Sequence, residues 1–321
     1  MNRRALIGRA IATACLLGGT PPWQMAAAAP DKPALRRKFT IDLTPGAIGI
    51  KAKPRELLDL AVTHGFESVQ PNTAFLAGLD KPQRKEFAHE LRAKGLTWGS
   101  AGMPVDFRRD TDTFRSGLKG LPKTAAALRD AGATRISTWL KPYHESLTYL
   151  ANFRQHTARL GEVTRILADH GLRFGLEYVG TRTLWTSSRH SFIHSLAEAR
   201  ELIAAINQPT LGFVLDSWHW FTAGETAEDI LTLKNRDIVA CDLNDAPAGI
   251  PVEAQLDNRR ELPAATGVID IAAFLQALAK VGYDGPVRAE PFNQPLRALD
   301  DAPAAKATAT AIRKAITQAG L

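Results

Sequence analysis

Cysteine is scarce in this sequence, and its scarcity excludes a fold held together by disulfides. The 321 residues contain two cysteines, Cys15 and Cys241. We expect Cys15 to be removed with an export signal, so the mature chain would keep one cysteine and have no internal disulfide, even in an oxidising compartment. The fold must therefore rest on its hydrophobic core, and the remaining ~290 residues are enough for one large core or two small ones.

The sequence also lacks any block of lysine and arginine and any long apolar run. The formal net charge is +7, and it falls to +4 when residues 1–29 are removed, because three arginines leave and no acid does. A mild, scattered basic excess gives no case for nucleic-acid binding. A membrane-spanning helix needs about 20 apolar residues, which no segment supplies. We therefore expect neither a nucleic-acid partner nor a membrane span.

Residues 1–29 have the layout of a cleavable export signal. Arg3, Arg4 and Arg9 surround a modestly apolar core, and small residues follow at positions 26–29. The adjacent Arg3–Arg4 pair favours the twin-arginine route, which carries already folded proteins. The sequence thus predicts an exported, periplasmic protein, with a non-cleaved N-terminal anchor as the alternative.

From Lys38 onward, short apolar runs alternate with longer amphipathic ones. Eight runs have strand character and end in Gly, Pro, Asn or Asp: residues 38–45, 65–71, 96–104, 134–142, 172–180, 211–219, 237–245 and 286–292. Helical periodicity fills the intervals between them. This alternation predicts an α/β protein with one domain over residues 38–321, a closed (β/α)8 TIM barrel. A doubly wound open sheet is the alternative, but no Gly-rich phosphate loop follows the first strand.

Acidic residues recur where the later strands end. The C-terminal ends of barrel strands converge on one mouth. The fifth strand delivers Glu177, and the three that follow deliver Asp216 with His219, Asp242 with Asp245, and Glu290. Any one acid alone could be a cap or an ion-pair partner, but several together repel unless a cation neutralises them. A divalent metal suits such oxygen ligands, and we predict Glu177, Asp216, Asp242 and Glu290 as its ligands.

Two of these acids also indicate a reaction. While a metal polarises a carbonyl, one glutamate can remove a proton and the other can return one. That is enolisation next to a ketone, the core of aldose–ketose isomerisation and epimerisation. Glu177 and Glu290 are therefore the predicted catalytic acid–base pair.

Five stretches carry a resemblance to a known family. They are GLEYVGTRT (175–183), LDSWHW (215–220), LNDAPAGIP (243–251), DNRRELPAATGVID (257–270) and GYDGPVRAEPF (282–292). In this order they resemble the xylose-isomerase-like TIM barrels of the sugar phosphate isomerase/epimerase superfamily, from Phe39 to about Ala315. The resemblance implies metal ligation by Glu177, Asp216 and Glu290, with Glu177 and Glu290 as acid and base. It further implies that His219 binds substrate oxygen or the metal, and that Arg260 contacts substrate.

The sequence departs from this family in two places. The seventh strand usually carries a His three positions before an Asp, and here Asp242 precedes Asp245. An all-carboxylate site would favour Mn²⁺ or Mg²⁺ over Zn²⁺; alternatively, Asp242 is not a ligand and the site is weakened or lost. The loop PAATG (263–267) stands where Pro-Gly-Glu is usual, which puts any substrate contact by that loop in doubt.

Other polar and aromatic residues near the strand ends have both a functional and a structural interpretation. Trp139 and Lys141, at the end of the fourth strand, could stack on a sugar ring and meet a substrate oxygen, or be structural. Arg182 either faces a ligand or is a solvated loop residue. Trp218 and Trp220 are either core residues or a sugar platform.

The leading prediction is a divalent-metal-dependent isomerase or epimerase acting on a carbohydrate, and export favours a free sugar or keto-sugar over a phosphorylated one. The same equipment could expel a leaving group β to a ketone, which would make a lyase acting on 3-keto-glycosides. A non-catalytic sugar-binding barrel is the remaining alternative. DNA-repair endonucleases share the barrel but surround several zinc ions with histidines, and here only His219 lies at a strand end. The identity of the sugar, the metal and the oligomeric state stay open.

Overall fold

Short strands alternate with helices from Leu35 to Leu321, the part of the chain that this computed structural model describes. The predicted export signal at residues 1–29 lies outside the described residues. The main sheet contains β1 (Thr40–Leu43), β2 (Ser68–Val69), β3 (Thr97–Trp98), β4 (Ala101–Gly102), β5 (Arg135–Trp139), β7 (Arg173–Glu177), β9 (Leu211–Asp216), β10 (Ile238–Leu243) and β11 (Pro286–Ala289). Each of the eight predicted strands contains at least one of these, which confirms them.

The sheet closes on itself through a split strand. All neighbouring strands pair in parallel, in the order β3-β2-β1-β11-β10-β9-β7-β5-β4. β3 and β4 stand at opposite ends of that order, yet only Gly99 and Ser100 separate them in the chain. Together they form the third strand of an eight-stranded barrel, which confirms the TIM barrel prediction.

Gly99 is required at this break because another strand approaches it closely. A Cβ atom built there would lie 2.2 Å from Oδ1 of Asp42, which belongs to β1. Asp42 is buried, and burial raises the pKa of its carboxyl above the ordinary value. Any side chain at position 99 would therefore displace a buried polar group.

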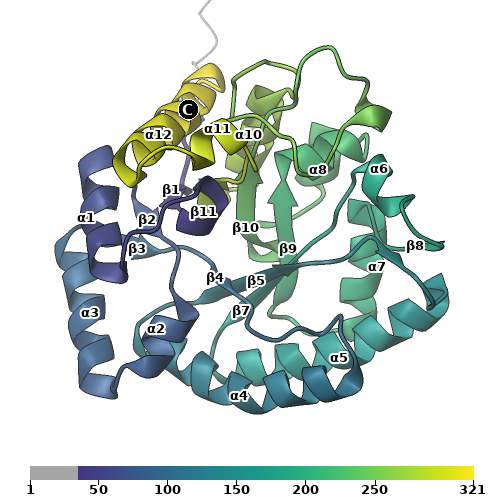
Figure 1. Ribbon diagram of the computed structural model, residues 1–321, viewed down its shortest axis with the longest axis horizontal. Coiled ribbons are helices and arrows are strands. Elements are labelled where there is room, and N and C mark those ends of the chain that lie inside the picture. The colour runs from purple at the N-terminus through teal and green to yellow at the C-terminus, as the bar shows by residue number, and fades with distance from the viewer. Residues whose placement is uncertain (1–34) are drawn as a thin grey trace, which may run out of the picture. The chain divides into compact units, whose positions relative to one another are not determined.

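Helices surround the barrel, and the first and last of them lie side by side (Figure 1). The helices are α1 (Pro54–His64), α2 (Thr73–Gly78), α3 (Lys81–Ala93), α4 (Thr111–Asp130), α5 (Tyr149–Asp169), α6 (Arg182–Trp185), α7 (Leu196–Ile206), α8 (Ser217–Thr222), α9 (Ala227–Leu231), α10 (Ile271–Lys280), α11 (Gln294–Arg297) and α12 (Asp301–Gln318), with short 3-10 turns at Pro45–Ile48, Asn235–Asp237 and Val252–Ala254. Within the range 35–321, none of them is both long enough and apolar enough to cross a membrane.

Local sequence fixes where these helices begin and which face they bury. Asp80, Asp110 and Ser195 cap α3, α4 and α7 by accepting from backbone N–H groups three residues on. α12 buries a stripe of mostly small residues, Ala304, Ala305, Thr308, Ala309, Ile312, Ala315 and Ile316. Small side chains at helical spacing let this helix pack closely on the barrel.

One element at the rim was not expected from the sequence. β6 (Tyr143–His144) and β8 (His190–Ser191) form a short antiparallel pair outside the barrel sheet. Neither segment is an apolar run, so the pattern that found the barrel strands gave no signal here.

Candidate active site at the mouth of the barrel

Strand register places an acidic and a basic side chain next to each other inside the barrel. Asp216 of β9 pairs in register with Asp242 of β10, and Asp242 pairs in turn with Arg288 of β11. Side chains at paired positions of parallel strands point to the same face. The three groups therefore lie on one level of the barrel interior, and all three are buried.

Four carboxylates come together here, and two of them, Asp216 and Asp242, belong to this level. Glu177 and Asp216 are the last residues of β7 and β9, Asp242 lies in β10, and Glu290 directly follows β11. Each offers one oxygen, and these oxygens all lie within 4.8 Å of one another. The structure thus brings together the four residues that the sequence predicts as metal ligands.

Arg260 enters this cluster from the long loop after β10. Its Nη1 donates to Asp216 Oδ2 at 2.7 Å and lies 3.6 Å from Glu290 Oε2, while Nη2 donates to Asp257 Oδ1 at 2.9 Å. Arg260 is buried, with 3% of its surface exposed. Arg260 therefore contacts the carboxylates of the cluster directly, and its predicted contact with substrate stays a prediction.

Arg288 pairs with Asp242 through two parallel hydrogen bonds. Its Nε donates to Asp242 Oδ1, and its Nη2 donates to Asp242 Oδ2 at 2.9 Å. Asp242 has no exposed surface and Arg288 exposes 8%. This planar two-point contact is the strongest geometry available to a guanidinium and a carboxylate.

His219 lies against the same cluster as a neutral ring. It exposes 2% of its surface, and its Nε2 is 3.7 Å from Glu177 Oε1. Burial, followed by the charge of Arg260, lowers the pKa of His219 to about 3. His219, Glu177 and Asp216 form a second group that could hold a metal ion.

Burial and mutual repulsion raise the pKa of three of the carboxyls. Burial raises the pKa of Glu290 to about 8 and that of Asp216 to about 6, with Asp242 adding to both. Burial also raises the pKa of Glu177 well above its ordinary value, and the neighbouring carboxylates raise it further. Such shifts are typical of catalytic carboxyls.

The residues present fit a divalent cation. Glu177 exposes 8% of its surface, and its Oε1 is buried without a hydrogen-bond partner among the described residues. A buried oxygen without a donor costs free energy unless a cation or a proton satisfies it. The carboxylates of the cluster, with Asp257 beside Arg260, outnumber its two guanidinium groups, and a divalent ion would reduce this excess of negative charge.

A pocket of about 320 Å³ opens onto two of these carboxylates, Glu177 and Glu290. Glu177, Glu290 and Arg288 form its floor, and Trp139 lies at its edge with 42% of its surface exposed. The guanidinium of Arg108 lies over the Trp139 indole, 4.6 Å from the ring centre, and so covers part of one ring face. The volume suits a monosaccharide-sized ligand.

Two predicted substrate contacts lie elsewhere. Lys141 is not among the residues that line this pocket; its Nζ sits 4.1 Å from the centre of the Tyr143 ring. Arg182 is exposed on α6 and lines a separate pocket of about 760 Å³ with Trp185 and Trp220. A substrate role for Lys141 or Arg182 stays a prediction.

The tryptophans beside His219 are packing residues. Trp218 has no exposed surface and donates to Thr181 Oγ1 at 2.9 Å. Trp220 exposes 7% and meets Phe274 edge to face, with ring centres 5.5 Å apart. Of the two interpretations left open by the sequence, the structure supports core packing.

Asp245 does not join the carboxylate cluster and instead holds a loop in place. Its oxygens accept from the backbone N–H groups of four residues: Ala246, Thr266, Gly267 and Ile269. The divergent loop 263–267 is thereby tied to β10. Ala264 in this loop has φ of 58°, a left-handed conformation that glycine adopts more easily.

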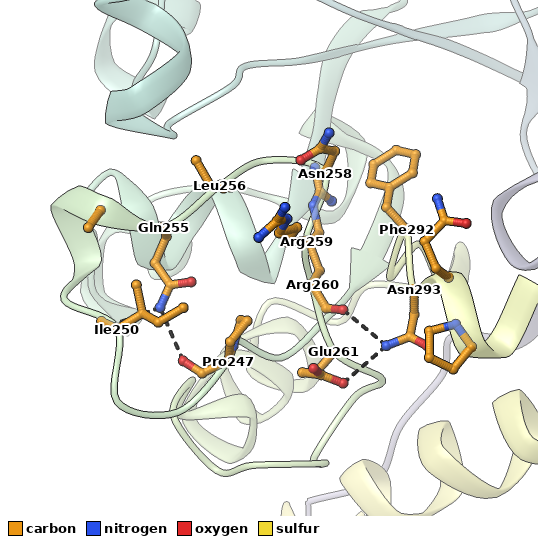
Figure 2. A pocket seen from close by; sticks show the side chains of 13 residues that line it. Pro247, Ile250, Gln255, Leu256, Asn258, Arg259, Arg260, Glu261, Phe292 and Asn293 are labelled. Atoms are coloured by element: carbon orange, nitrogen blue, oxygen red, sulfur yellow. Dashed lines mark hydrogen bonds between the residues drawn. The ribbon is translucent and has the colours of Figure 1, made fainter.

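A second pocket, of about 430 Å³, lies beyond Arg260 (Figure 2). Phe292, Ile250 and Leu256 contribute apolar surface, and Asn293 donates to Glu261 Oε2 at 3.1 Å. Phe292 has φ of 43°, and its ring centre lies 4.7 Å from the Arg260 guanidinium carbon. An unfavourable backbone conformation of this kind costs about 1–3 kcal/mol and clusters at functional sites.

Several residues of the site escaped the sequence analysis, above all Arg288. A signal was available, because Arg288 precedes Glu290 by two positions on one strand and so faces the same side. Arg108 and Asp257 gave no comparable signal. They come from loops whose path depends on the whole fold.

Comparison with known proteins finds similar sequences over most of the chain. The family model described as "Xylose isomerase-like TIM barrel" matches residues 58–315. Inosose isomerase from Bacillus subtilis is 27% identical over 133 residues, which is 41% of this chain and 45% of that protein. Ketose 3-epimerase from Arthrobacter globiformis is 29% identical over 195 residues, 60% of this chain and 61% of that protein. The chain therefore spans about half of each of these relatives.

Solved structures agree on the fold. A xylose isomerase domain protein from Alicyclobacillus acidocaldarius superposes with a TM-score of 0.77 at 27% identity, covering 88% of this chain and 99% of that chain. The IOLI protein with a bound zinc atom superposes with a TM-score of 0.72 at 17% identity, covering 87% of this chain and 99% of that chain. At 17% identity the likeness shows the fold alone, and the zinc is a property of that protein.

Proposed function

The chain belongs to the xylose isomerase-like TIM barrel family, and we propose that it is a divalent-metal-dependent isomerase or epimerase of a sugar or keto-sugar. The observation that carries this proposal is the buried, unpartnered Oε1 of Glu177 among four converging carboxylate oxygens. Inosose isomerase and ketose 3-epimerase, which resemble parts of this chain, are consistent with that chemistry.

We propose that Glu177, Asp216 and Glu290 hold the cation at the floor of the pocket of about 320 Å³ beside Trp139. A divalent cation there would polarise the carbonyl oxygen of a bound ketose and make the neighbouring C–H group more acidic. An all-oxygen set of carboxylates supports Mn²⁺ or Mg²⁺ over Zn²⁺. The neutral His219 ring beside Glu177 supplies a hydrogen-bonding group for a substrate hydroxyl.

The two glutamates divide the proton transfers. One carboxylate removes the proton from the carbon next to the carbonyl, and the electron pair moves onto the carbonyl oxygen. The other carboxyl group returns a proton, to the opposite face of the same carbon in epimerisation or to the former carbonyl carbon in isomerisation. In isomerisation the hydroxyl on the deprotonated carbon becomes the new carbonyl, and its proton passes to the former carbonyl oxygen.

The substrate we propose is a free sugar, because export would remove the protein from phosphorylated metabolites. Export itself rests on residues 1–29, which lie outside the described structure. The pocket of about 320 Å³ accommodates one sugar ring beside Trp139.

Deuterium exchange tests the proposal. Metal-loaded protein incubated with free ketoses and inososes in D₂O should introduce deuterium next to the carbonyl, detected by NMR. Glu177→Gln and Glu290→Gln should each abolish exchange, because each removes a proton carrier. Glu253→Gln, at an exposed rim position, is the matched control and should leave the rate unchanged. If no carbonyl sugar exchanges its proton above the background rate, the proposal fails.

The pocket beside Phe292 favours a second candidate, a lyase acting on 3-keto-glycosides. In that reaction a carboxylate removes the C2 proton, the C1–O bond breaks, and the leaving aglycone oxygen takes up a proton. The partly apolar pocket beyond Arg260 offers room for an aglycone. The 3-keto derivative of p-nitrophenyl glucoside is a direct probe, because elimination releases coloured nitrophenolate. Exchange without release would favour the isomerase.

A further inference from the structure

The fourth position of the carboxylate cluster is filled differently from the other three. Glu177 has a free oxygen, whereas both oxygens of Asp242 are bound by one guanidinium group. We propose that the Asp242–Arg288 ion pair takes the place of a fourth metal ligand, so that Glu177, Asp216 and Glu290 alone supply the carboxylate ligands. This inference rests on the proposed function, since it concerns the same metal.

The geometry of the two arginine contacts distinguishes Asp242 from Asp216. Arg288 donates two parallel hydrogen bonds to Asp242. They occupy the edge between the two carboxylate oxygens, where a metal ion would bind if Asp242 chelated it. Arg260 meets Asp216 at one oxygen only, through Nη1 at 2.7 Å, and divides its remaining contacts between Asp257, His219 and Glu290. Asp216 Oδ1 also accepts from the backbone N–H of Trp218 and from Asn244 Nδ2, each at 2.8 Å. Three separate donors thus hold Asp216, and no single group spans both of its oxygens, so a cation can approach Asp216 without breaking a two-point pair.

The position of Arg288 is imposed by the sheet and not by a mobile loop. Asp242 and Arg288 are register partners on adjacent strands, so their backbones hold the two groups side by side. Both are buried, and nearby carboxylates, chiefly Asp242, hold the pKa of Arg288 well above its ordinary value against the effect of burial. A permanently charged, buried guanidinium has to keep a carboxylate partner. Asp242 is therefore needed as the ion-pair partner of Arg288.

The two Asp–Arg pairs of the site allow a matched test by isothermal titration of metal-stripped full-length protein with Mn²⁺. The double variant Asp242→Asn with Arg288→Gln removes a pair without changing net charge, and such replacements are often well tolerated. We expect it to bind one Mn²⁺ per chain with a Kd changed by less than about tenfold. Tenfold is the smallest loss of metal affinity typical of mutating a residue that orients a ligand without being one. Asp216→Asn with Arg260→Gln also preserves net charge, and we expect it to weaken Mn²⁺ binding by more than about 100-fold.

Each outcome decides between stated alternatives. If the 242/288 variant loses Mn²⁺ as the 216/260 variant does, Asp242 is a ligand and the inference is wrong, while the proposed function stands. If the 216/260 variant keeps Mn²⁺, the three-carboxylate set is wrong. If wild type binds none of Mn²⁺, Mg²⁺, Co²⁺ or Zn²⁺, the proposed function fails as well. Should a variant misfold by circular dichroism, the anomalous signal of Mn²⁺ in crystals of the wild-type protein shows directly whether Asp242 or only the other three carboxylates coordinate it.

Discussion

The buried carboxyl of Glu290 should make the metal-free protein lose stability as the pH rises through neutrality. The pKa of Glu290 is raised from 4.5 to about 8, chiefly by burial. Between these two values the folded chain keeps a proton that the unfolded chain has lost. The free energy of unfolding therefore falls with increasing pH, by at most about 1.4 kcal/mol per pH unit for this group.

The range from pH 6.5 to 7.5 isolates this effect. Below pH 6.5 the buried histidines His156 and His219 act in the opposite direction, because burial lowers their pKa values to about 4 and about 3. Protons then bind to the unfolded chain and not to the folded one, so stability rises with pH. Above pH 6.5 this contribution fades, because an unfolded histidine is about half protonated at pH 6.5 and about one tenth protonated at pH 7.5. What remains is the same in wild type and in a Glu290 variant.

The assay is urea unfolding in EDTA at pH 6.5, 7.0 and 7.5, for wild type and Glu290→Gln. We expect the wild-type free energy of unfolding to fall more steeply, by about 1 kcal/mol per pH unit relative to the variant. The comparison cancels groups that do not interact with Glu290, including Glu225, whose pKa burial raises to about 7. Saturating Mn²⁺ should remove the difference, since a bound cation displaces the proton. Parallel profiles for the two proteins without metal would refute the reasoning.

Three further predictions concern the stability of the barrel around the site and the export of the protein. Gly99→Ala should lower the free energy of unfolding by about 1–3 kcal/mol through its clash with Asp42; Gly102→Ala, where a Cβ meets nothing within 4 Å, is the control in the same urea assay. Asp245→Asn should cost about 3 kcal/mol in that assay, because four backbone donors lose a charged acceptor; equal stability would contradict its role in the loop. Replacing Arg3 and Arg4 by lysine should abolish periplasmic accumulation on immunoblots of cell fractions, and unchanged accumulation would exclude the twin-arginine route.

The barrel could be predicted from the sequence because its signal is local and repeated. Each barrel strand lies in a short run that ends at a turn-forming residue, and helical periodicity fills the intervals. The division of the third strand into β3 and β4 could not be foreseen. It depends on the contact between Gly99 and Asp42, which are 57 positions apart in the sequence.

The candidate site could be predicted in part, for a related reason. Carboxylates at strand ends must converge in a barrel, so Glu177, Asp216 and Glu290 follow from topology alone. The engagement of Arg260 with Asp216 depends on the path of a long loop, which no periodicity encodes. Asp245 looked like a site residue by position, but only the folded loop reveals the four backbone donors that surround it.

The register pairing of Asp242 with Arg288 makes each residue depend on the other when the sequence changes. Substituting one partner of a buried ion pair without the other costs about 3–5 kcal/mol, which is a large part of the stability of a typical domain. The two substitutions are therefore expected to be inherited together, or through a neutral intermediate at one position. An arginine two residues before the eighth-strand glutamate, together with an aspartate in the seventh strand, would then mark a lineage within the family.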